Sequence, residues 1–384
     1  MRKSKYLILN SFYFEFNDGL TYIIRKELLR KQNILDLERF NKCTVIPDRF
    51  AYLNLNFIYL STNVISIELV SFSNNQIQIL DLSNCKNLIE IGICSFQCNQ
   101  IKCLRLPQNI EIIKEIAFQD NQIQSLNLSN YKKLKYIEKD SFSYNQIKQL
   151  KLPINIRKIE ENSFRHNQIE KLDLSNCIKL KNIERRAFKD NQIKQLKLPK
   201  NIEIIDDYAF CKNKIELLDL SNCINLKTIK NWSFSYNQIK ELKLPQNIEN
   251  IEIGTFHKNQ IEMLDLSNYI NLKIIDIRTF ENNTIKELKL PNNIEKIDWF
   301  AFMNNQIELL DLSNCINLEI IKENAFADNP LKKIKILNNI NINYEPNVDW
   351  KYDVWNKFVK YYNDNGKKSG DYKYENDEWK WYLL

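Results

Sequence analysis

The sequence contains very little glycine and histidine, with five glycines and two histidines in 384 residues. Scarce glycine argues against the glycine-rich loops that bring the backbone close to phosphate groups. The two histidines, His166 and His257, leave few imidazole groups for catalysis or for binding zinc. No Ser/His/Asp set and no paired acid and base stand out from the pattern. The sequence therefore predicts a protein that is not an enzyme, with no catalytic residues, no cofactor site and no metal site.

Long apolar segments are also lacking. No run of apolar residues approaches the length of about 20 that spans a bilayer. The one apolar stretch near the N-terminus, Tyr6 to Leu9, is interrupted by Asn10 and Ser11, which is unlike a cleavable signal peptide. We therefore expect no membrane insertion and favour an intracellular, cytoplasmic protein.

What the sequence has in abundance is repetition. The phrase Leu-Asp-Leu-Ser-Asn-Cys and two near-copies recur every 46 residues, beginning at Leu80, Leu126, Leu172, Leu218, Leu264 and Leu310. A second phrase, Leu-x-Leu-Pro-x-Asn-Ile, lies between the copies. Leu80 to Leu104 is 24 residues and Leu104 to Leu126 is 22, so each period holds two coils of slightly unequal length. A period in this range indicates one structural unit stacked many times.

Each coil predicts one strand. The Leu-x-Leu alternation is only long enough for a very short parallel strand, which buries its apolar face when coils stack. Matching spacing runs from Leu35 to Ile336 and gives 14 rungs. We predict an α/β-type solenoid over residues 35–342, of about 14 coils of 22–24 residues, with turns or short helical segments opposite the strands. The asparagines of the second phrase, such as Asn109 and Asn155, are predicted to point inward and bond to turn backbone as a ladder.

The repeated phrases resemble leucine-rich repeats. They read Ile-x-x-Leu-x-Leu-x-x-Cys-x-x-Leu and Ile-x-x-Leu-x-Leu-Pro-x-Asn-Ile. Ala-Phe pairs make the chain similar to the BspA-like branch of this family. These pairs begin at Ala117, Ala187, Ala209, Ala301 and Ala325. One departure is an asparagine three residues after each phenylalanine, where that branch often has Gly-Cys; we expect this asparagine to turn the chain. The resemblance implies a fold shaped as a horseshoe or superhelix. It also implies a function in adhesion to surfaces or host components. The composition, rich in Asn, Ile and Lys, is similar to that of repeat proteins from giant viruses and protists.

Both ends break the repeat, as terminal caps do. Residues 1–34 are predicted to form an N-terminal cap with a helix from about Leu20 to Lys31, capped by Asn17 or Asp18. Residues 343–384 are predicted to form an aromatic C-terminal cap.

Apolar residues at helical spacing between Val348 and Tyr362 predict a helix in this C-terminal cap, which Asn365-Gly366 would end. Alternating aromatics after it predict a hairpin. These aromatics either cover the last coil or stack on a sugar or peptide; a cap is favoured.

The residue between the two leucines of each strand alternates in charge from coil to coil. Opposite charges on neighbouring strands stabilise a sheet by about 0.2–1 kcal/mol per pair. These residues are Asp81, Arg105, Asn127, Lys151, Asp173, Lys197, Asp219, Lys243, Asp265, Lys289, Asp311 and Lys335. The formal net charge of +7 is spread along the chain. A nucleic-acid-binding protein concentrates its positive charge, so no nucleic acid is expected as a partner.

The residue before the first leucine also points outward and is less regular. At this position Leu217, Met263 and Leu309 form an apolar stripe rimmed by Glu241 and Glu287. An apolar centre with a polar rim is typical of a protein-binding surface. The alternative explanation for these apolar residues is that repeat duplication copied a residue that the fold tolerates and that binds nothing. The candidate partner-binding residues are Leu217, Met263, Leu309, Glu241, Glu287, Lys243, Asp265 and Lys289.

Nine cysteines raise the question of disulfides and metals. The recurrent ones lie two rungs apart, about 9–10 Å, which is too far for a disulfide. We predict that they are small buried fillers; they are Cys85, Cys177, Cys223 and Cys315. The cluster of Cys94, Cys98 and Cys103 lacks zinc spacing. The odd number of cysteines favours reduced thiols.

Together these patterns predict a non-enzymatic protein–protein interaction scaffold that binds a partner protein through its exposed parallel sheet. The alternative is a surface adhesin of BspA-like type that binds host or extracellular components. A third possibility is a repeat array that binds nothing specific.

Overall fold

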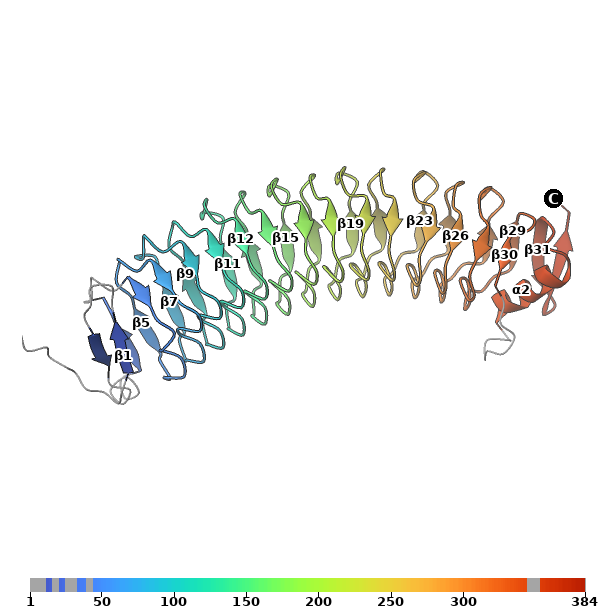
Figure 1. Ribbon diagram of the computed structural model, residues 1–384. Helices are drawn as coiled ribbons and strands as arrows, with labels where there is room; N and C mark the ends of the chain where they lie inside the picture. Colours follow the sequence, from blue (N-terminus) through green and yellow to red (C-terminus); the bar gives the residue numbers. More distant parts are fainter. Residues whose placement is uncertain (1–11, 16–20, 25–32, 39–43, 344–352, 384) are drawn as a thin grey trace, which may run out of the picture. The chain divides into compact units, whose positions relative to one another are not determined.

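The computed structural model describes residues 12–15, 21–24, 33–38, 44–343 and 353–383. The chain divides into two compact units, Met1–Gln192 and Ile193–Leu384, and each is described by itself. Both are stacks of short coils (Figure 1). Across the described ranges, no helix is long and apolar enough to cross a membrane.

A first parallel sheet runs along each unit, with one strand per coil on the Leu-x-Leu phrase. The central leucine or isoleucine of each strand points into the core, whereas the residues beside it are mostly exposed. The first unit contains β3 (Ile34–Asp36), β5 (Phe57–Tyr59), β7 (Ile79–Asp81), β9 (Cys103–Arg105), β11 (Ser125–Asn127), β13 (Gln149–Lys151) and β15 (Lys171–Asp173). The second contains β17 (Gln195–Lys197), β19 (Leu217–Asp219), β21 (Glu241–Lys243), β23 (Met263–Asp265), β25 (Glu287–Lys289), β27 (Leu309–Asp311) and β29 (Lys333–Ile336). The predicted strands and rungs are confirmed.

A second parallel sheet lies on the other side of the coils. The sequence predicts turns or short helical segments on this side. Within the described coils, the structure has turns and, in each coil, a two-residue strand that ends on a buried isoleucine. These strands are β4 (Val45–Ile46), β6 (Ser66–Ile67), β8 (Glu90–Ile91), β10 (Ile112–Ile113), β12 (Tyr136–Ile137), β14 (Lys158–Ile159) and β16 (Asn182–Ile183) in the first unit. In the second they are β18 (Ile204–Ile205), β20 (Thr228–Ile229), β22 (Asn250–Ile251), β24 (Ile274–Ile275), β26 (Lys296–Ile297), β28 (Ile320–Ile321) and β30 (Asn341–Ile342).

Stacked phenylalanines form one wall of the core. In the first unit the rings of Phe142 and Phe164 lie 5.5 Å apart at 3°, and in the second those of Phe280 and Phe302 lie 5.5 Å apart at 6°. All four rings are fully buried. Because each coil supplies one ring, burial of this side of the core depends on the neighbouring coils.

Buried asparagines join successive coils. Asn99 Nδ2 donates to the Phe72 carbonyl of the preceding coil at 2.9 Å, and Asn99 Oδ1 accepts the Ile77 N–H at 3.1 Å. The same bonds recur at the asparagine three residues after each phenylalanine in most coils. The asparagine ladder is therefore made by these residues. Asn109 and Asn155, predicted to form it, bond to turn carbonyls as expected but are only half-buried.

The tight turn around each phenylalanine uses two left-handed residues. Around Phe142 they are Asp140 (φ 53°) and Tyr144 (φ 54°). A left-handed conformation costs a non-glycine residue about 1–2 kcal/mol. Both N–H groups donate to carbonyls of the next coil, at 3.0 and 2.9 Å, which holds the turn in place. Asn145 was expected to turn the chain, but the residue before it does so.

The C-terminal cap has the predicted helix and hairpin. The helix α2 (Val354–Asp364) places Trp355 5.0 Å from the last stacked ring, Phe326. β31 (Gly370–Glu375) pairs antiparallel with β29 and with β32 (Glu378–Tyr382). The predicted helical residues before 353 lie outside the described residues. Five aromatic side chains of the cap are buried, whereas Tyr382 is 39% exposed; the buried ones are Trp355, Phe358, Tyr362, Tyr372 and Trp379.

The N-terminal cap differs from the prediction. β1 (Phe12–Glu15) pairs antiparallel with β2 (Thr21–Ile24). The helix expected from about Leu20 to Lys31 is therefore wrong at residues 21–24. Thr-Tyr-Ile-Ile is rich in β-branched and aromatic residues, which favour a strand when a partner strand is available. The rest of that predicted helix lies outside the described residues.

Candidate protein-binding surface

The outer face of the first sheet in the second unit carries the predicted apolar residues. Leu217, Met263 and Leu309 open β19, β23 and β27, and their exposed fractions are 52, 66 and 51%. Strand register places Glu241 opposite Leu217, and Glu287 opposite Met263. Apolar and acidic side chains therefore alternate along this edge, as the sequence predicted.

Ion pairs form a second row on the same face. Lys289 Nζ lies 3.2 Å from Asp265 Oδ2, and register places Lys243 opposite Asp219. The Ser267 hydroxyl donates to Asp265 at 2.5 Å. This bond, then the bond from the Ser267 N–H and the interaction with Lys289, lowers the pKa of Asp265 despite partial burial. The predicted facing of opposite charges is confirmed.

A hollow of about 500 Å³ lies between β25 and β27. Glu287, Lys289 and Leu309 line it, together with Asp311. Three of the eight candidate residues thus share one concave site. Met263 and Asp265 are the register partners of Glu287 and Lys289 on the adjacent strand. The remaining three, Leu217, Glu241 and Lys243, belong to the separate strand pair β19–β21.

A second apolar row was missed from the sequence. Ile224, Ile270 and Ile316 are 61, 67 and 72% exposed. Each follows the Cys or Tyr of the longer coil, in the same coils as Leu217, Met263 and Leu309. The signal was available, because the longer coil has two additional residues in this turn and its tip extends beyond the core.

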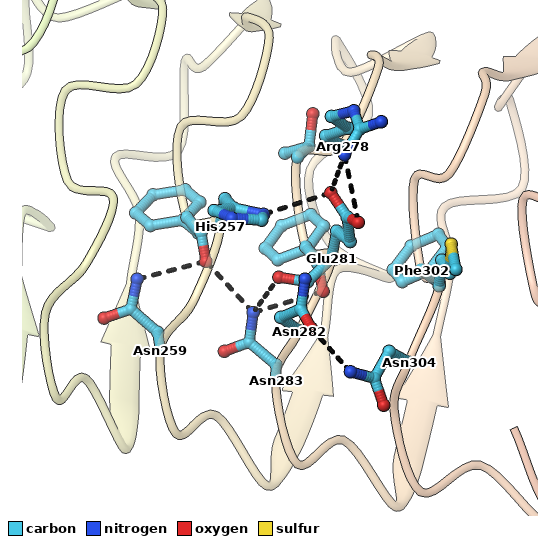
Figure 2. A network of polar contacts seen from close by, with 12 residues as sticks. His257, Asn259, Arg278, Glu281, Asn282, Asn283, Phe302 and Asn304 are labelled. Carbon is cyan, nitrogen blue, oxygen red and sulfur yellow. Dashed lines mark hydrogen bonds and ion pairs between the residues drawn. The ribbon is translucent and has the colours of Figure 1, made fainter. Parts of the chain in front are cut away.

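A buried polar network was also missed (Figure 2). His257 Nδ1 lies 3.1 Å from Glu281 Oε2, and Arg278 Nη1 donates to both Glu281 oxygens at 3.0 and 3.1 Å. The side chains of His257 and Glu281 are only 6 and 7% exposed. The ring of Trp232 meets His257 edge-on at 5.2 Å. These groups lie on the phenylalanine turns of three successive coils, and their contacts join one turn to the next.

The recurrent cysteines are core residues. Cys85 Sγ lies 3.7 Å from the Ser61 carbonyl, and Cys177 Sγ lies 3.7 Å from that of Pro153. Burial raises the thiol pKa to about 11 at Cys85 and to about 12 at Cys315. The prediction of small buried fillers is confirmed.

None of the eight cysteines within the described ranges is in a disulfide. Cys94 and Cys98 are half-buried and Cys103 is exposed. In that same part of the chain, no group of three or more His, Cys, Asp or Glu side chains is arranged to hold a metal ion.

The repeat matches a known family model. The model describes a BspA-type leucine-rich repeat region in six copies, and it matches residues 44–170, 157–283 and 255–345. The chain belongs to the BspA-type leucine-rich repeat family. Proteins built from such repeats are typically non-enzymatic protein-interaction scaffolds.

One of the similar solved structures shows the same fold. A leucine-rich repeat protein from Bacteroides ovatus is 16% identical, with a TM-score of 0.51 over 88% of this chain and 90% of that one. A leucine-rich repeat protein from Leptospira interrogans is 17% identical (TM-score 0.41; 73 and 80% covered). An internalin from Listeria monocytogenes is 15% identical (TM-score 0.45; 82 and 85% covered). No curated protein matches the BspA-type chain. At these identities the likeness concerns the fold alone.

Proposed function

We propose that this BspA-type protein is a non-enzymatic scaffold that binds a partner protein through the first sheet of its second unit. The observation that carries the proposal is the row of Leu217, Met263 and Leu309, half or more exposed on a sheet whose other outward positions are charged or polar. Exposed apolar side chains with a charged rim supply the buried centre and polar edge of a protein interface. The hollow beside Leu309 would receive a projecting side chain of the partner.

The charged side chains of Lys243, Asp265 and Lys289 form the rim of this surface. Charges at a rim steer encounter and set specificity more than they add affinity. We therefore expect raised salt to slow association with the partner while changing dissociation little.

The test removes the apolar row. Each of the three side chains would bury about half of its surface, which contributes about 1 kcal/mol. Changing Leu217, Met263 and Leu309 together to Ser should weaken partner binding about 100-fold. The partner is first identified by affinity capture and mass spectrometry, and its affinity is then titrated with purified protein.

A matched control is available in the first unit. Ile79 is 55% exposed at the equivalent position of β7. Ile79→Ser should leave the affinity unchanged. Equal affinities of the triple variant and the wild type would contradict the proposal, provided that both have the same circular dichroism spectrum.

The second candidate is an adhesin displayed on a surface, as the family resemblance implies. Among the described cysteines Cys103 is the exposed one, and it distinguishes the two candidates because a thiol exposed outside the cell tends to oxidise. Cell fractionation with thiol labelling separates the two candidates. Oxidised Cys103 in a surface fraction would support the adhesin.

A further inference from the structure

From Glu111 to Glu295, the residue that precedes each short strand of the second sheet follows a charge rule with one exception. Glutamate in the shorter coils faces lysine in the longer ones: Glu111 pairs with Lys135 at 2.8 Å in the first unit. In the second unit Glu249 pairs with Lys227, and Glu295 with Lys273, both at 2.7 Å. These pairs neutralise the edge of the sheet.

Arg157 breaks this rule. It occupies the glutamate position, so Lys135, Arg157 and Lys181 follow one another on three successive coils. The Arg157 N–H donates to the Lys135 carbonyl at 2.8 Å, so these two residues are neighbours. Like charges on adjacent strands destabilise a sheet. Among the described residues no ion pair involves Arg157, so its positive charge has no evident stabilising partner in the fold.

A hollow of about 590 Å³ lies at this break, within the first unit. Its lining has four cations and one carboxylate beside polar, aromatic and aliphatic groups: Tyr136, Arg157, Lys158, Ile178, Lys179, Lys181, Asn182 and Glu184. Lys158 is paired with Glu160 at 2.8 Å, and Glu184 acts on Lys158 as well. The uncompensated positive charge therefore lies toward Arg157 and Lys179.

The chemistry of the lining selects a ligand class. Guanidinium presents a planar fork that binds phosphate oxygens in pairs, and lysines add point charges. The ring of Tyr136 and the side chain of Ile178, which is 54% exposed, give the hollow an apolar wall. A volume of this size accommodates a small organic molecule or a few residues of a peptide.

We propose that this hollow binds a phosphate monoester with an aromatic or apolar group, the phosphate on Arg157 and Lys179 and the apolar group against Tyr136 and Ile178. A small aryl phosphate and a phosphotyrosine side chain of a partner protein share this chemistry. The site lies on the second sheet of the first unit, so it is separate from the surface formed by Leu217, Met263 and Leu309.

Titration calorimetry of the full chain tests the proposal with four probes. They are phenyl phosphate, inorganic phosphate, a short peptide containing phosphotyrosine, and the same peptide without phosphate. Phenyl phosphate should bind at least tenfold more tightly than inorganic phosphate. If the phosphotyrosine peptide binds tenfold more tightly than phenyl phosphate, the ligand of the hollow is a segment of a partner protein. If the two bind equally, the ligand is a small molecule. Equal binding of the two peptides, or of phenyl phosphate and inorganic phosphate, would overturn the proposal.

Arg157→Glu is the decisive variant because it restores the charge rule of the other coils. The melting temperature should be unchanged or higher, while affinity for phenyl phosphate falls at least tenfold. Lys86→Glu makes the same charge change at an exposed position of the first unit outside the hollow, and should leave both quantities unchanged. Arg157→Gln is a second variant that should also lose affinity. Unchanged affinity in both Arg157 variants would refute the site.

Discussion

Replacing Asn145 with Ala tests whether the buried asparagines hold the coils together. Asn145 Nδ2 donates to the Phe118 carbonyl of the preceding coil at 2.9 Å, and Oδ1 accepts the Ile123 N–H at 3.1 Å. The Phe118 carbonyl would keep a bond from Asn121 at 3.2 Å. The Ile123 N–H would lose its side-chain acceptor, and an unsatisfied buried donor costs about 1–3 kcal/mol.

The lost bonds and the small cavity add to this cost, so we expect Asn145→Ala to lower the free energy of unfolding by about 3 kcal/mol. Asn155→Ala is the matched control. Asn155 makes one bond, to the Lys132 carbonyl at 3.0 Å, in a setting that water reaches. Its loss should cost about 0.5–1 kcal/mol.

Urea unfolding followed by circular dichroism measures both variants. Because repeat arrays often unfold in several steps, amide hydrogen exchange at Ile123 supplies a local readout, and this amide should exchange faster in Asn145→Ala only. Equal unfolding midpoints and equal exchange at Ile123 in the two variants would refute the reasoning.

Three further outcomes are expected. Gly254→Ala should cost about 1–3 kcal/mol more than Gly366→Ala: both glycines have positive φ, but only at Gly254 would a Cβ meet a neighbour, the Trp232 ring at 2.5 Å. Equal melting temperatures of the two variants would show that Trp232 moves away at no cost. In the native protein at pH 8, maleimide should label the exposed Cys103 and leave the buried Cys315 unlabelled until urea is added. Because burial raises the pKa of Cys315 from about 9 to about 12, its contribution to stability is complete below pH 9 and is lost as pH rises from 9 toward 12. An unfolding midpoint that rises between pH 9 and pH 12 would contradict this expected loss of stability.

The candidate surface was predictable because it depends on strand alternation alone. Once Leu218 is inside, Leu217 and Asp219 must point outward, and the return of the Leu-x-Leu phrase in the next coil sets Lys243 opposite Asp219. The hollow beside Leu309 was not predictable, since its walls come from residues more than 20 positions apart whose side-chain conformations the sequence does not give. The same limit applies to the burial of His257 against Glu281.

The sequence by itself determined the period, the two coil types, the first sheet, the buried cysteines and the C-terminal cap. Each depends on spacing along the chain and on which residues are apolar, and both are visible in a linear pattern. Only the tertiary structure decided the second sheet, because a two-residue strand has no period to detect. It also decided which asparagines form the ladder, because the linear pattern does not show that Asn99 is buried whereas Asn109 is only half-buried. The strand at Thr21–Ile24 required a partner strand, and the hollow around Arg157 required three coils side by side.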